Sequence, residues 1–366
     1  MPQRRVPVVL LLAFAATPLG AQVVTGRVVD LATAEAVGEG FVVLLDEGGN
    51  EVGRVLTTVE GGFALQAPRP GQYRLRSERI GYLAVTSAPL TLESSDTLIH
   101  TISVAWVGVA LAPLEVTART SCGTRPDEDS STATVWEEVR KALAGAAWTT
   151  SDGAYRYLAV RYQEDWDTNR RKSTRQVAET TLGYARAPFA SRPAAALVEH
   201  GYVVTEQDSV SYFAPDAVVL QDDAFLATHC FAIVRRSLGA GRQVGLSFEP
   251  VPERRLPDVK GALWLDERTA ELRVLEFTYT RRPAREGGGS SGGLIEFLKL
   301  PSGAWVVHRW RIRMPMMVVR LRVGSHGARR EELVLRGFRD VGGDILAVLT
   351  AEGVLVYQAA SQHPTR

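Results

Sequence analysis

Short apolar segments separated by turn residues recur through most of this 366-residue sequence and constrain its fold more than any other feature. After residue 153 each segment is long enough for a strand but short for a helix. Residues 264–275 and 294–314 have the pattern of hairpins, which turn through an acidic sequence and through Pro-Ser-Gly. Successive hairpins favour a large antiparallel sheet. The predicted strands after residue 153 are 154–165, 176–184, 202–213, 225–234, 243–248, 261–265, 272–280, 294–300, 304–314, 317–323, 332–338 and 345–358.

The first residues have the order of an export signal. Arg4 and Arg5 form a basic start, residues 6–16 are apolar apart from one proline, and small residues lead up to Ala21. Signal peptidase recognises this order, and so short an apolar run does not span a bilayer, which takes about 20 residues. We predict a signal peptide over residues 1–21, a mature chain without a transmembrane segment, and a location in the periplasm or at the periplasmic face of the outer membrane.

Four motifs with glycine lie in residues 22–118. They are Gly-Arg-Val-Val-Asp at 26–30, Gly-Gly-Phe at 61–63, Pro-Gly-Gln-Tyr-Arg-Leu at 70–75 and Gly-Tyr at 81–82. Together they resemble the carboxypeptidase regulatory-like domain family. The resemblance implies an accessory Ig/prealbumin-like β-sandwich, a bacterial envelope protein and no peptidase chemistry. The family usually carries Thr-Asp before its Gly-x-Phe motif, whereas this chain has Thr-Val-Glu.

The histidines argue independently against a zinc peptidase. Such an enzyme needs a His-x-x-Glu pair and a distant histidine, so that imidazole and carboxylate meet on one ion. No histidine of this chain has glutamate three residues later. The histidines are His100, His200, His229, His308, His326 and His363.

A polar stretch with Gly123 and Pro126 is a predicted linker over residues 119–132. A helix is predicted over 133–147, with Glu137 and Glu138 in its first turn, where they suit the positive helix end. Residues 133–366 then form a large antiparallel β-sheet domain with this one N-terminal helix. The architecture is similar to the half-barrels of lipoprotein-carrier proteins of the bacterial envelope. The predicted fold class is mainly β, a sandwich followed by this sheet.

Charge and motifs exclude several functions. The formal charge is +1, so no overall field attracts nucleic acid. The sequence has neither a phosphate-binding glycine-rich loop nor a dinucleotide fingerprint, and no cofactor is expected. Residues 289–293 match the Gly-x-Ser-x-Gly nucleophile pattern, but a nucleophile elbow needs a helix after it, and here a strand is predicted. We interpret this segment as a hairpin loop.

Cys122 and Cys230 are the two cysteines of the sequence. In an exported protein they form a candidate disulfide. Two separate thiols are the alternative. Metal binding by both cysteines with His229 is a third reading, made awkward because His229 and Cys230 are strand neighbours that point to opposite faces.

A basic run gives the candidate ligand-binding residues. Alternation predicts that Trp305 and Val307 share a strand face with three arginines, while His308 and Trp310 lie on the other. A positive stripe would suit phosphate, acidic glycan or lipid headgroups. The alternative is a solvated sheet face whose arginines pair with acids such as Asp340. The candidate residues are Arg309, Arg311, Arg313, Arg320 and Arg322.

Two acidic pairs are candidates for acid–base chemistry or calcium binding, Asp165 with Asp167 and Asp222 with Asp223. All four are predicted in turns, where a solvated carboxylate is the simpler interpretation.

The leading hypothesis is a non-enzymatic exported envelope protein whose sheet binds a partner or an apolar ligand. An envelope protein, a glycan or a lipid is the expected partner. One alternative is a carbohydrate-binding protein, for which Tyr73, Tyr82 and Trp106 are the candidate aromatics of the sandwich. The other is a hydrolase that uses acidic residues.

Overall fold

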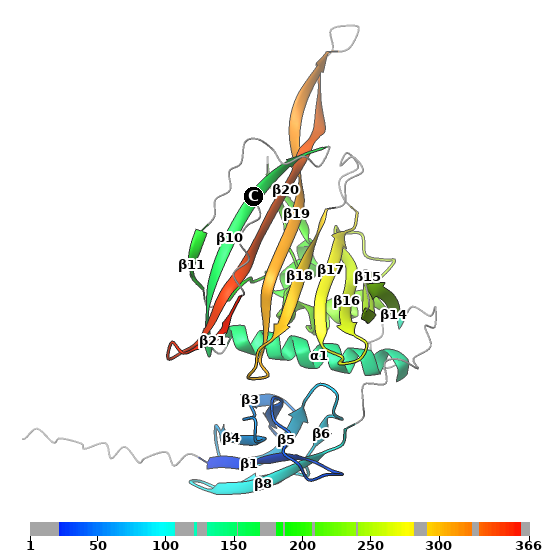
Figure 1. Ribbon diagram of the computed structural model, residues 1–366. Helices are drawn as coiled ribbons and strands as arrows, with labels where there is room; N and C mark the ends of the chain where they lie inside the picture. The colour runs from blue at the N-terminus through cyan, green and yellow to red at the C-terminus, as the bar shows by residue number, and fades with distance from the viewer. Residues whose placement is uncertain are drawn as a thin grey trace, which may run out of the picture.

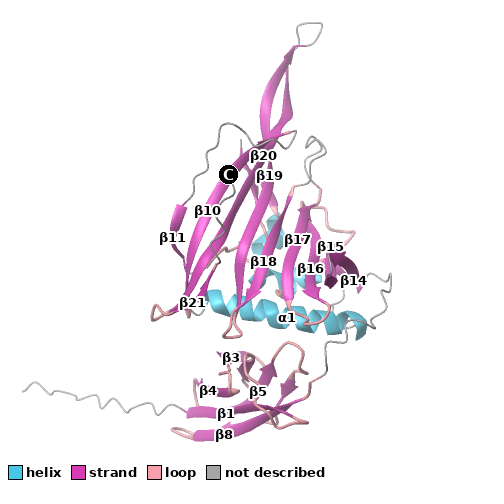
Figure 2. Cartoon of the chain, viewed as in Figure 1, coloured by secondary structure: helices cyan, strands magenta, loops and turns pink. Residues whose placement is uncertain are grey.

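The computed structural model describes residues 22–106, 121–122, 130–151, 153–168, 181–185, 187–206, 209–238, 241–281, 291–323 and 329–359. Strands dominate this part of the chain (Figure 2), which confirms the predicted mainly β fold. The predicted signal peptide and most of the predicted linker lie outside the described residues. No helix among the described residues is long and apolar enough to cross a membrane.

Residues 22–106 fold as a sandwich of two sheets (Figure 1), as predicted. One sheet has the order β4–β1–β8 and the other β3–β2–β5–β6, with β7 also on β5. Alternate side chains of β4 and β5 point into one apolar core, among them Phe63, Leu65, Tyr73 and Leu75. The strands are β1 (Gln22–Asp30), β2 (Phe41–Leu45), β3 (Glu51–Leu56), β4 (Gly62–Ala67), β5 (Gly71–Glu78), β6 (Val85–Thr86), β7 (Leu90–Leu92) and β8 (Thr97–Val104).

Most strands in the rest of the described chain form one 11-stranded sheet, here called the large sheet. Its order is β11–β10–β20–β19–β18–β17–β16–β15–β14–β9, and β21 also pairs with β20. From β14 to β20 each strand pairs antiparallel with the next, which confirms the predicted succession of hairpins. The strands are β9 (Ser121–Cys122), β10 (Tyr155–Asp167), β11 (Thr181–Ala185), β14 (His229–Leu238), β15 (Gly241–Pro250), β16 (Val259–Asp266), β17 (Leu272–Tyr279), β18 (Gly292–Lys299), β19 (Trp305–Val323), β20 (Arg329–Thr350) and β21 (Leu355–Gln358).

Four helices and a small hairpin accompany the large sheet. The helices are α1 (Ser130–Ser151), α2 (Ala194–His200), α3 (Ala217–Leu220) and α4 (Asp223–Ala227), and the hairpin is β12 (Val203–Glu206) with β13 (Ser209–Tyr212). Helix α1 contacts β14, β15, β17, β19 and α3. Val135, Val139 and Leu143, at four-residue spacing, form its buried stripe.

We call the face of the large sheet that packs on the helices the inner face. Its described side chains belong to one continuous apolar core with those of the helices. Phe225 of α4 meets Phe231 and Phe248 edge to face, with ring centroids 6.4 and 5.5 Å apart. Trp310 packs against Gly343, where an added Cβ would be 2.3 Å from the indole ring. The described inner face is therefore filled by its own side chains.

Helix α1 also joins the large sheet to the sandwich, and Figure 1 shows it lying between the two. Lys141 on this helix donates to the main-chain carbonyl of Tyr82 at 2.8 Å and to Glu138 at 2.7 Å. Glu138 in turn accepts from the main-chain N–H of Gly81 at 2.9 Å. Each charged group of this pair is thus bonded to the sandwich main chain.

A second set of contacts joins the same helix to strands β2, β3 and β5. Arg140 donates to Glu78 at 2.9 Å, and Arg54 donates to the other oxygen of the same carboxylate at 2.9 Å. Next to them Phe41 and Trp148 meet edge to face, with centroids 5.3 Å apart. Helix α1 therefore contacts the large sheet on one side and the sandwich on the other.

Helix α1 is longer than predicted, since it covers 130–151 and not 133–147. Glu137 and Glu138 consequently lie beyond its first turn, and the prediction that they complement the helix end is wrong. They form ion pairs instead, Glu137 with Arg140 and Arg76, and Glu138 with Lys141.

Other element boundaries also differ from prediction. The predicted strands 304–314 and 317–323 are one strand, β19, and the predicted strand 225–234 begins as helix α4. Helices α2, α3 and α4 were not predicted. Their signals are Pro193 before α2 and the side chains of Asp216 and Asp222, which cap the first N–H groups of α3 and α4.

Candidate functional site

A β-bulge in β19 decides where the predicted arginine stripe points. Adjacent residues of β18 pair with Arg309 and Val307, which leaves His308 as an extra residue. The alternation shifts there, so Trp305 and Trp310 both lie in the inner core. The prediction that Trp305 and Val307 share a face with the arginines is wrong, because the arginines point to the opposite, outer face.

Two of these arginines are held by acids of the neighbouring strand β20. Arg313 donates through two nitrogens to the buried carboxylate of Asp340, both at 2.7 Å. Arg309 donates to Asp344 at 2.5 Å. These hydrogen bonds raise the pKa of both guanidinium groups. The predicted alternative, a sheet face of arginines paired with acids, therefore describes these two positions.

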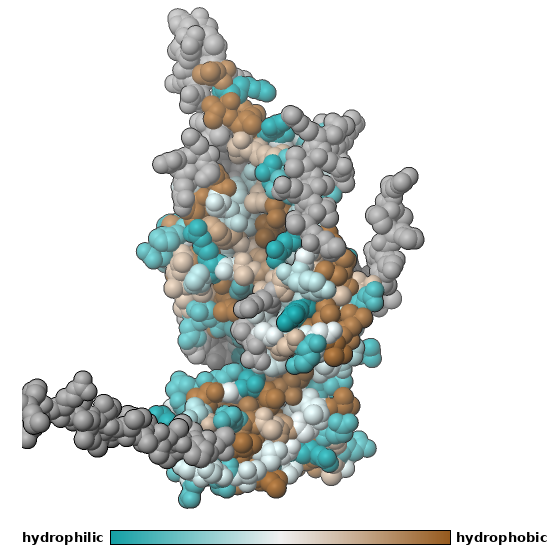
Figure 3. All heavy atoms as spheres, turned by 90° about the vertical axis from the view of Figure 1, so that its left-hand side faces the viewer, coloured by the Kyte–Doolittle hydropathy of each residue, from teal (hydrophilic) through white to brown (hydrophobic). Residues whose placement is uncertain are grey.

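The other three candidate arginines do not form one site. Arg311 points to the outer face and makes no ion pair with a described residue. Arg320 is exposed farther along β19, between Val319 and Leu321, which are each 61% exposed. Figure 3 shows apolar residues at this end of the molecule. Arg322 belongs to β19, but its side chain lies outside the described residues.

Two of the four candidate acidic residues, Asp165 and Asp222, have structural roles. The prediction that Asp165 and Asp167 lie in a turn is wrong, because both belong to strand β10. Asp165 accepts two hydrogen bonds from Arg339, at 2.8 and 2.9 Å, which lower the pKa of its carboxyl. Asp222 caps α4 by accepting from the N–H of Ala224 at 2.8 Å. In the described part of the chain no three His, Cys, Asp or Glu residues are grouped so that they could hold a metal ion.

A buried polar network surrounds His229 at the start of β14. Its Nε2 lies 3.3 Å from Oδ1 of the buried Asp258, and its Nδ1 lies 2.9 Å from the carbonyl of Phe225. Arg254 binds Asp258 and donates to the carbonyls of Leu197 and Val198 in the last turn of α2. The network joins α2, α4 and β16. The network contains one carboxylate, whereas a glycoside hydrolase that uses acidic residues needs a pair of carboxyl groups that face each other.

The two cysteines lie in adjacent strands. Cys122 of β9 pairs directly opposite Cys230 of β14. Directly opposite residues have Cα atoms about 4.5–5.5 Å apart, within the disulfide range of roughly 4.4–6.8 Å. No free cysteine occurs in the part of the chain that the structure describes. Both observations support the predicted disulfide.

Of the three candidate aromatics of the sandwich, one is largely exposed. Tyr73 is buried and donates to the carbonyl of Arg69 at 2.7 Å. Tyr82 is partly buried beside Trp106, which is 59% exposed. The candidates therefore do not form a shared aromatic platform.

The segment with the Gly-x-Ser-x-Gly pattern lies partly outside the described residues. Ser291, at the position of the nucleophile, is buried immediately before strand β18. A strand and not a helix follows it, as predicted.

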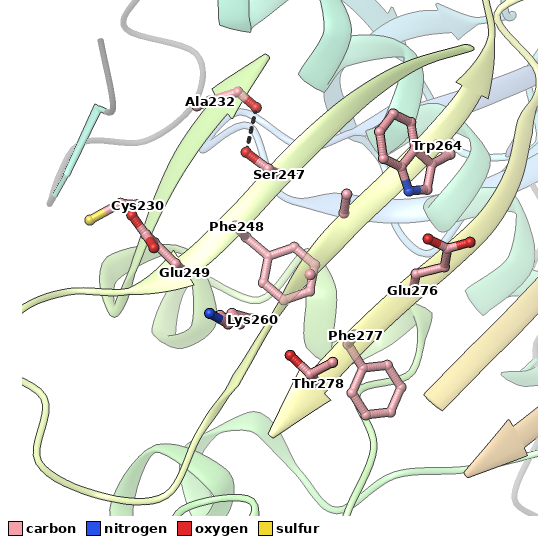
Figure 4. Close-up of a pocket in the computed structure, with 12 residues that line it drawn as sticks. Cys230, Ala232, Ser247, Phe248, Glu249, Lys260, Trp264, Glu276, Phe277 and Thr278 are labelled. Carbon is pink, nitrogen blue, oxygen red and sulfur yellow. Dashed lines mark hydrogen bonds between the residues drawn. The ribbon is translucent and has the colours of Figure 1, made fainter. Parts of the chain in front are cut away.

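A hollow of about 450 Å³ lies on the outer face of the large sheet, across β14 to β17 (Figure 4). Its floor contains the small residues Ala232, Ser247 and Ala262, which are directly opposite one another in adjacent strands. Larger side chains rise around this row. Because small side chains leave the sheet surface low at this point, the floor itself produces the hollow.

A second hollow of about 190 Å³ continues the first towards β18 and β19. Both are lined by Phe277 and Thr278, and the second adds Arg311 and Arg313. We call the two together the outer-face groove. Sequence reasoning missed it except for the arginines, because only the strand register brings Ala232, Ser247 and Ala262 together.

Trp264 forms one end of the groove. Its ring lies against Gly245, where an added Cβ would be 2.7 Å from the indole. The guanidinium of Arg236 covers the ring at 4.0 Å from its centroid, and donates to Glu276 at 2.7 Å and Gln243 at 2.7 Å. The indole is therefore fixed in place.

Comparison of the sequence with known protein families agrees with the motifs of the sandwich. Residues 23–105 match the model of the carboxypeptidase regulatory-like domain, which confirms the resemblance for this part of the chain. No curated protein sequence matches the chain.

Two of the solved structures that are similar to the chain have the following matches. One is a candidate carbohydrate binding protein from Bacteroides uniformis, with 9% identity, a TM-score of 0.20, and coverage of 64% of this chain and 92% of that one. The other is BcpA, the major pilin subunit of Bacillus cereus, with 10% identity, a TM-score of 0.21, and coverage of 88% and 95%.

Proposed function

We propose that this chain is a non-enzymatic exported protein that binds its ligand in the outer-face groove of the large sheet. The signal sequence predicted over 1–21 supports export. The regulatory-like sandwich supports an accessory role for residues 22–118. In this proposal the sandwich and the sheet of residues 133–366 act as one unit, because both are bound to α1.

The observation that carries the proposal is that the described inner face is filled while the outer face is hollowed. A carrier of an apolar ligand holds it inside a curved sheet. Here that position is taken by α1, α3 and α4 and by aromatic side chains such as Trp310 and Phe225. The groove is therefore the better candidate for a ligand site.

The contacts of the acidic candidates favour binding over catalysis. A general acid or base has to reach the substrate proton. Asp165 is engaged by Arg339, Asp222 caps a helix, and Asp258 is enclosed by His229 and Arg254. Each of these carboxylates already has a partner that explains its place.

A variant that fills the groove tests the proposal. We expect Ala262→Trp to abolish retention of a glycan or lipid fraction of bacterial envelope by the mature chain, because the new ring would occupy the floor. Thr101→Trp, on the exposed face of β8, is the matched control and should retain what the wild type retains. Retention by Ala262→Trp, or catalytic conversion of the retained material, would contradict the proposal.

A further inference from the structure

The indole N–H of Trp264 has no hydrogen-bond acceptor, although the residue is only 9% exposed. A buried donor without a partner costs on the order of 1–3 kcal/mol, so such groups are rare unless something else binds them. Figure 4 draws this nitrogen on the side of the ring that faces Glu276 and the hollow. The groove therefore offers a fixed donor to a ligand oxygen.

Strand register arranges the other polar groups of the groove in two rows. In one row Lys260, Thr278, Gly292 and Arg313 lie opposite one another across β16 to β19. The ends of this row are roughly 14 Å apart, since three strand spacings separate them. The groove is thus long and narrow, and it carries a hydroxyl group at its middle.

The second row consists of Ala262, Glu276, Leu294 and Arg311. It alternates apolar side chains with charged ones. Such a row suits a ligand that has both C–H surface and hydroxyl groups, because each kind of group finds a matching neighbour.

The charges of the groove are not all neutralised. Glu276 is held by Arg236, and Arg313 is held by Asp340. Lys260 and Arg311 make no ion pair with a described residue, and neither does Glu249, so two positive charges and one negative charge remain available. An arginine in this state is suited to bind a carboxylate through two parallel hydrogen bonds.

The position of the groove argues against an extended peptide. A peptide strand binds to a sheet through a free edge. Strands β15 to β18 are each paired on both sides, so their main-chain groups are already used. A ligand in the groove has to bind through side chains.

We infer that the outer-face groove binds an acidic oligosaccharide, with a carboxylate of the sugar on Arg311 and a sugar oxygen accepting from Nε1 of Trp264. This inference rests on the proposed function and specifies the ligand of the same site. Glu276 and Leu294 lie between these two contacts, and Thr278 and Lys260 lie in the neighbouring row, on the side away from Trp264, where they bind further hydroxyl groups.

The test uses the mature chain and short oligosaccharides of galacturonate, alginate and hyaluronan, each compared with its methyl ester, by isothermal titration calorimetry. We expect at least one acid form to bind. Its neutral ester should bind at least about tenfold more weakly, because a hydrogen-bonded charge is lost. Arg311→Gln should remove this difference between acid and ester. Trp264→Phe, which keeps a ring but lacks the N–H, should weaken both.

Arg309→Gln is the control, since Arg309 lies on the same face and pairs with Asp344 outside the groove. It should bind like the wild type, and near-ultraviolet circular dichroism checks the folding of each variant. Equal binding of acid and ester, or binding of no acid form, overturns the inference. If a neutral ligand still binds the wild type and Ala262→Trp prevents this binding, the proposed function stands although the inference about an acidic ligand fails. A ligand retained by Ala262→Trp overturns both.

Discussion

Oε1 of Glu78 on strand β5 lies 2.9 Å from a guanidinium nitrogen of Arg140 on helix α1, and the glutamate side chain is only 3% exposed. Arg54 and Arg76 contact the same carboxylate. Burial alone would raise the pKa of Glu78, but the guanidinium groups of Arg140, Arg54 and Arg76 outweigh it, so this pKa lies below its ordinary value. The carboxylate therefore links the sandwich to the helix that packs on the large sheet.

Glu78→Gln is expected to lower the free energy of unfolding by about 3–5 kcal/mol, because the partly buried arginines lose their common counter-charge. Urea denaturation of the mature chain measures this loss. Glu51→Gln is the matched control, since Glu51 also binds Arg54 but is 45% exposed, and its removal should cost about 0–1 kcal/mol. Similar losses in both variants would mean that the buried link is unimportant.

The same cluster predicts a dependence of stability on pH. Burial raises the pKa of Glu137, and the neighbouring Arg140 lowers it. The net effect is a decrease, as for Glu78. A carboxyl whose pKa is lowered by folding stabilises the protein above the ordinary value of 4.5, and this contribution disappears as the pH falls through the folded-state pKa. We expect the free energy of unfolding to fall below about pH 4.5, and to fall less in Glu78→Gln. Parallel pH profiles for wild type and variant would refute this assignment.

Periodicity and turn residues were sufficient to predict the sandwich and the meander of the large sheet. Local alternation was not sufficient for the arginine stripe, because it assumes an unbroken strand. One extra residue, His308, reversed the faces of everything after it. A bulge is set by how β18 and β19 meet, and a single sequence carries no record of that pairing.

The groove escaped prediction for a related reason. Ala232, Ser247 and Ala262 are unremarkable in their own strands, and they form a floor only because register places them side by side. The same holds for Trp264, because its ring can lie where it does only if the adjacent strand has glycine at position 245. Residues that act across strands need the register before they can be recognised.

The Cys122–Cys230 disulfide remains a prediction with a direct test. Peptide mapping without reduction should find the two cysteines linked, and Cys230→Ser should lower the free energy of unfolding by roughly 4–5 kcal/mol, as expected for a closed loop on the order of 100 residues. Adding a reductant to the wild type should reproduce the loss. Two reactive thiols in the unfolded, unreduced protein would contradict the disulfide.

Trp310 and Gly343 provide a test of the filled inner face. Gly343→Ala should lower the free energy of unfolding by about 1–3 kcal/mol, because the new Cβ would be 2.3 Å from Cη2 of Trp310 in a core that has no room to shift. Gly183→Ala is the control, since an added Cβ there meets no atom within 4 Å, and its effect should stay within about 0.5 kcal/mol. Thermal denaturation of Gly343→Ala, of Trp310→Phe and of the variant that combines them completes a double-mutant cycle. The smaller ring should recover part of the loss, because it removes the atom that the Cβ approaches. Additive effects in the double variant would show that the indole does not lie against Gly343, and that the inner face has space for a ligand.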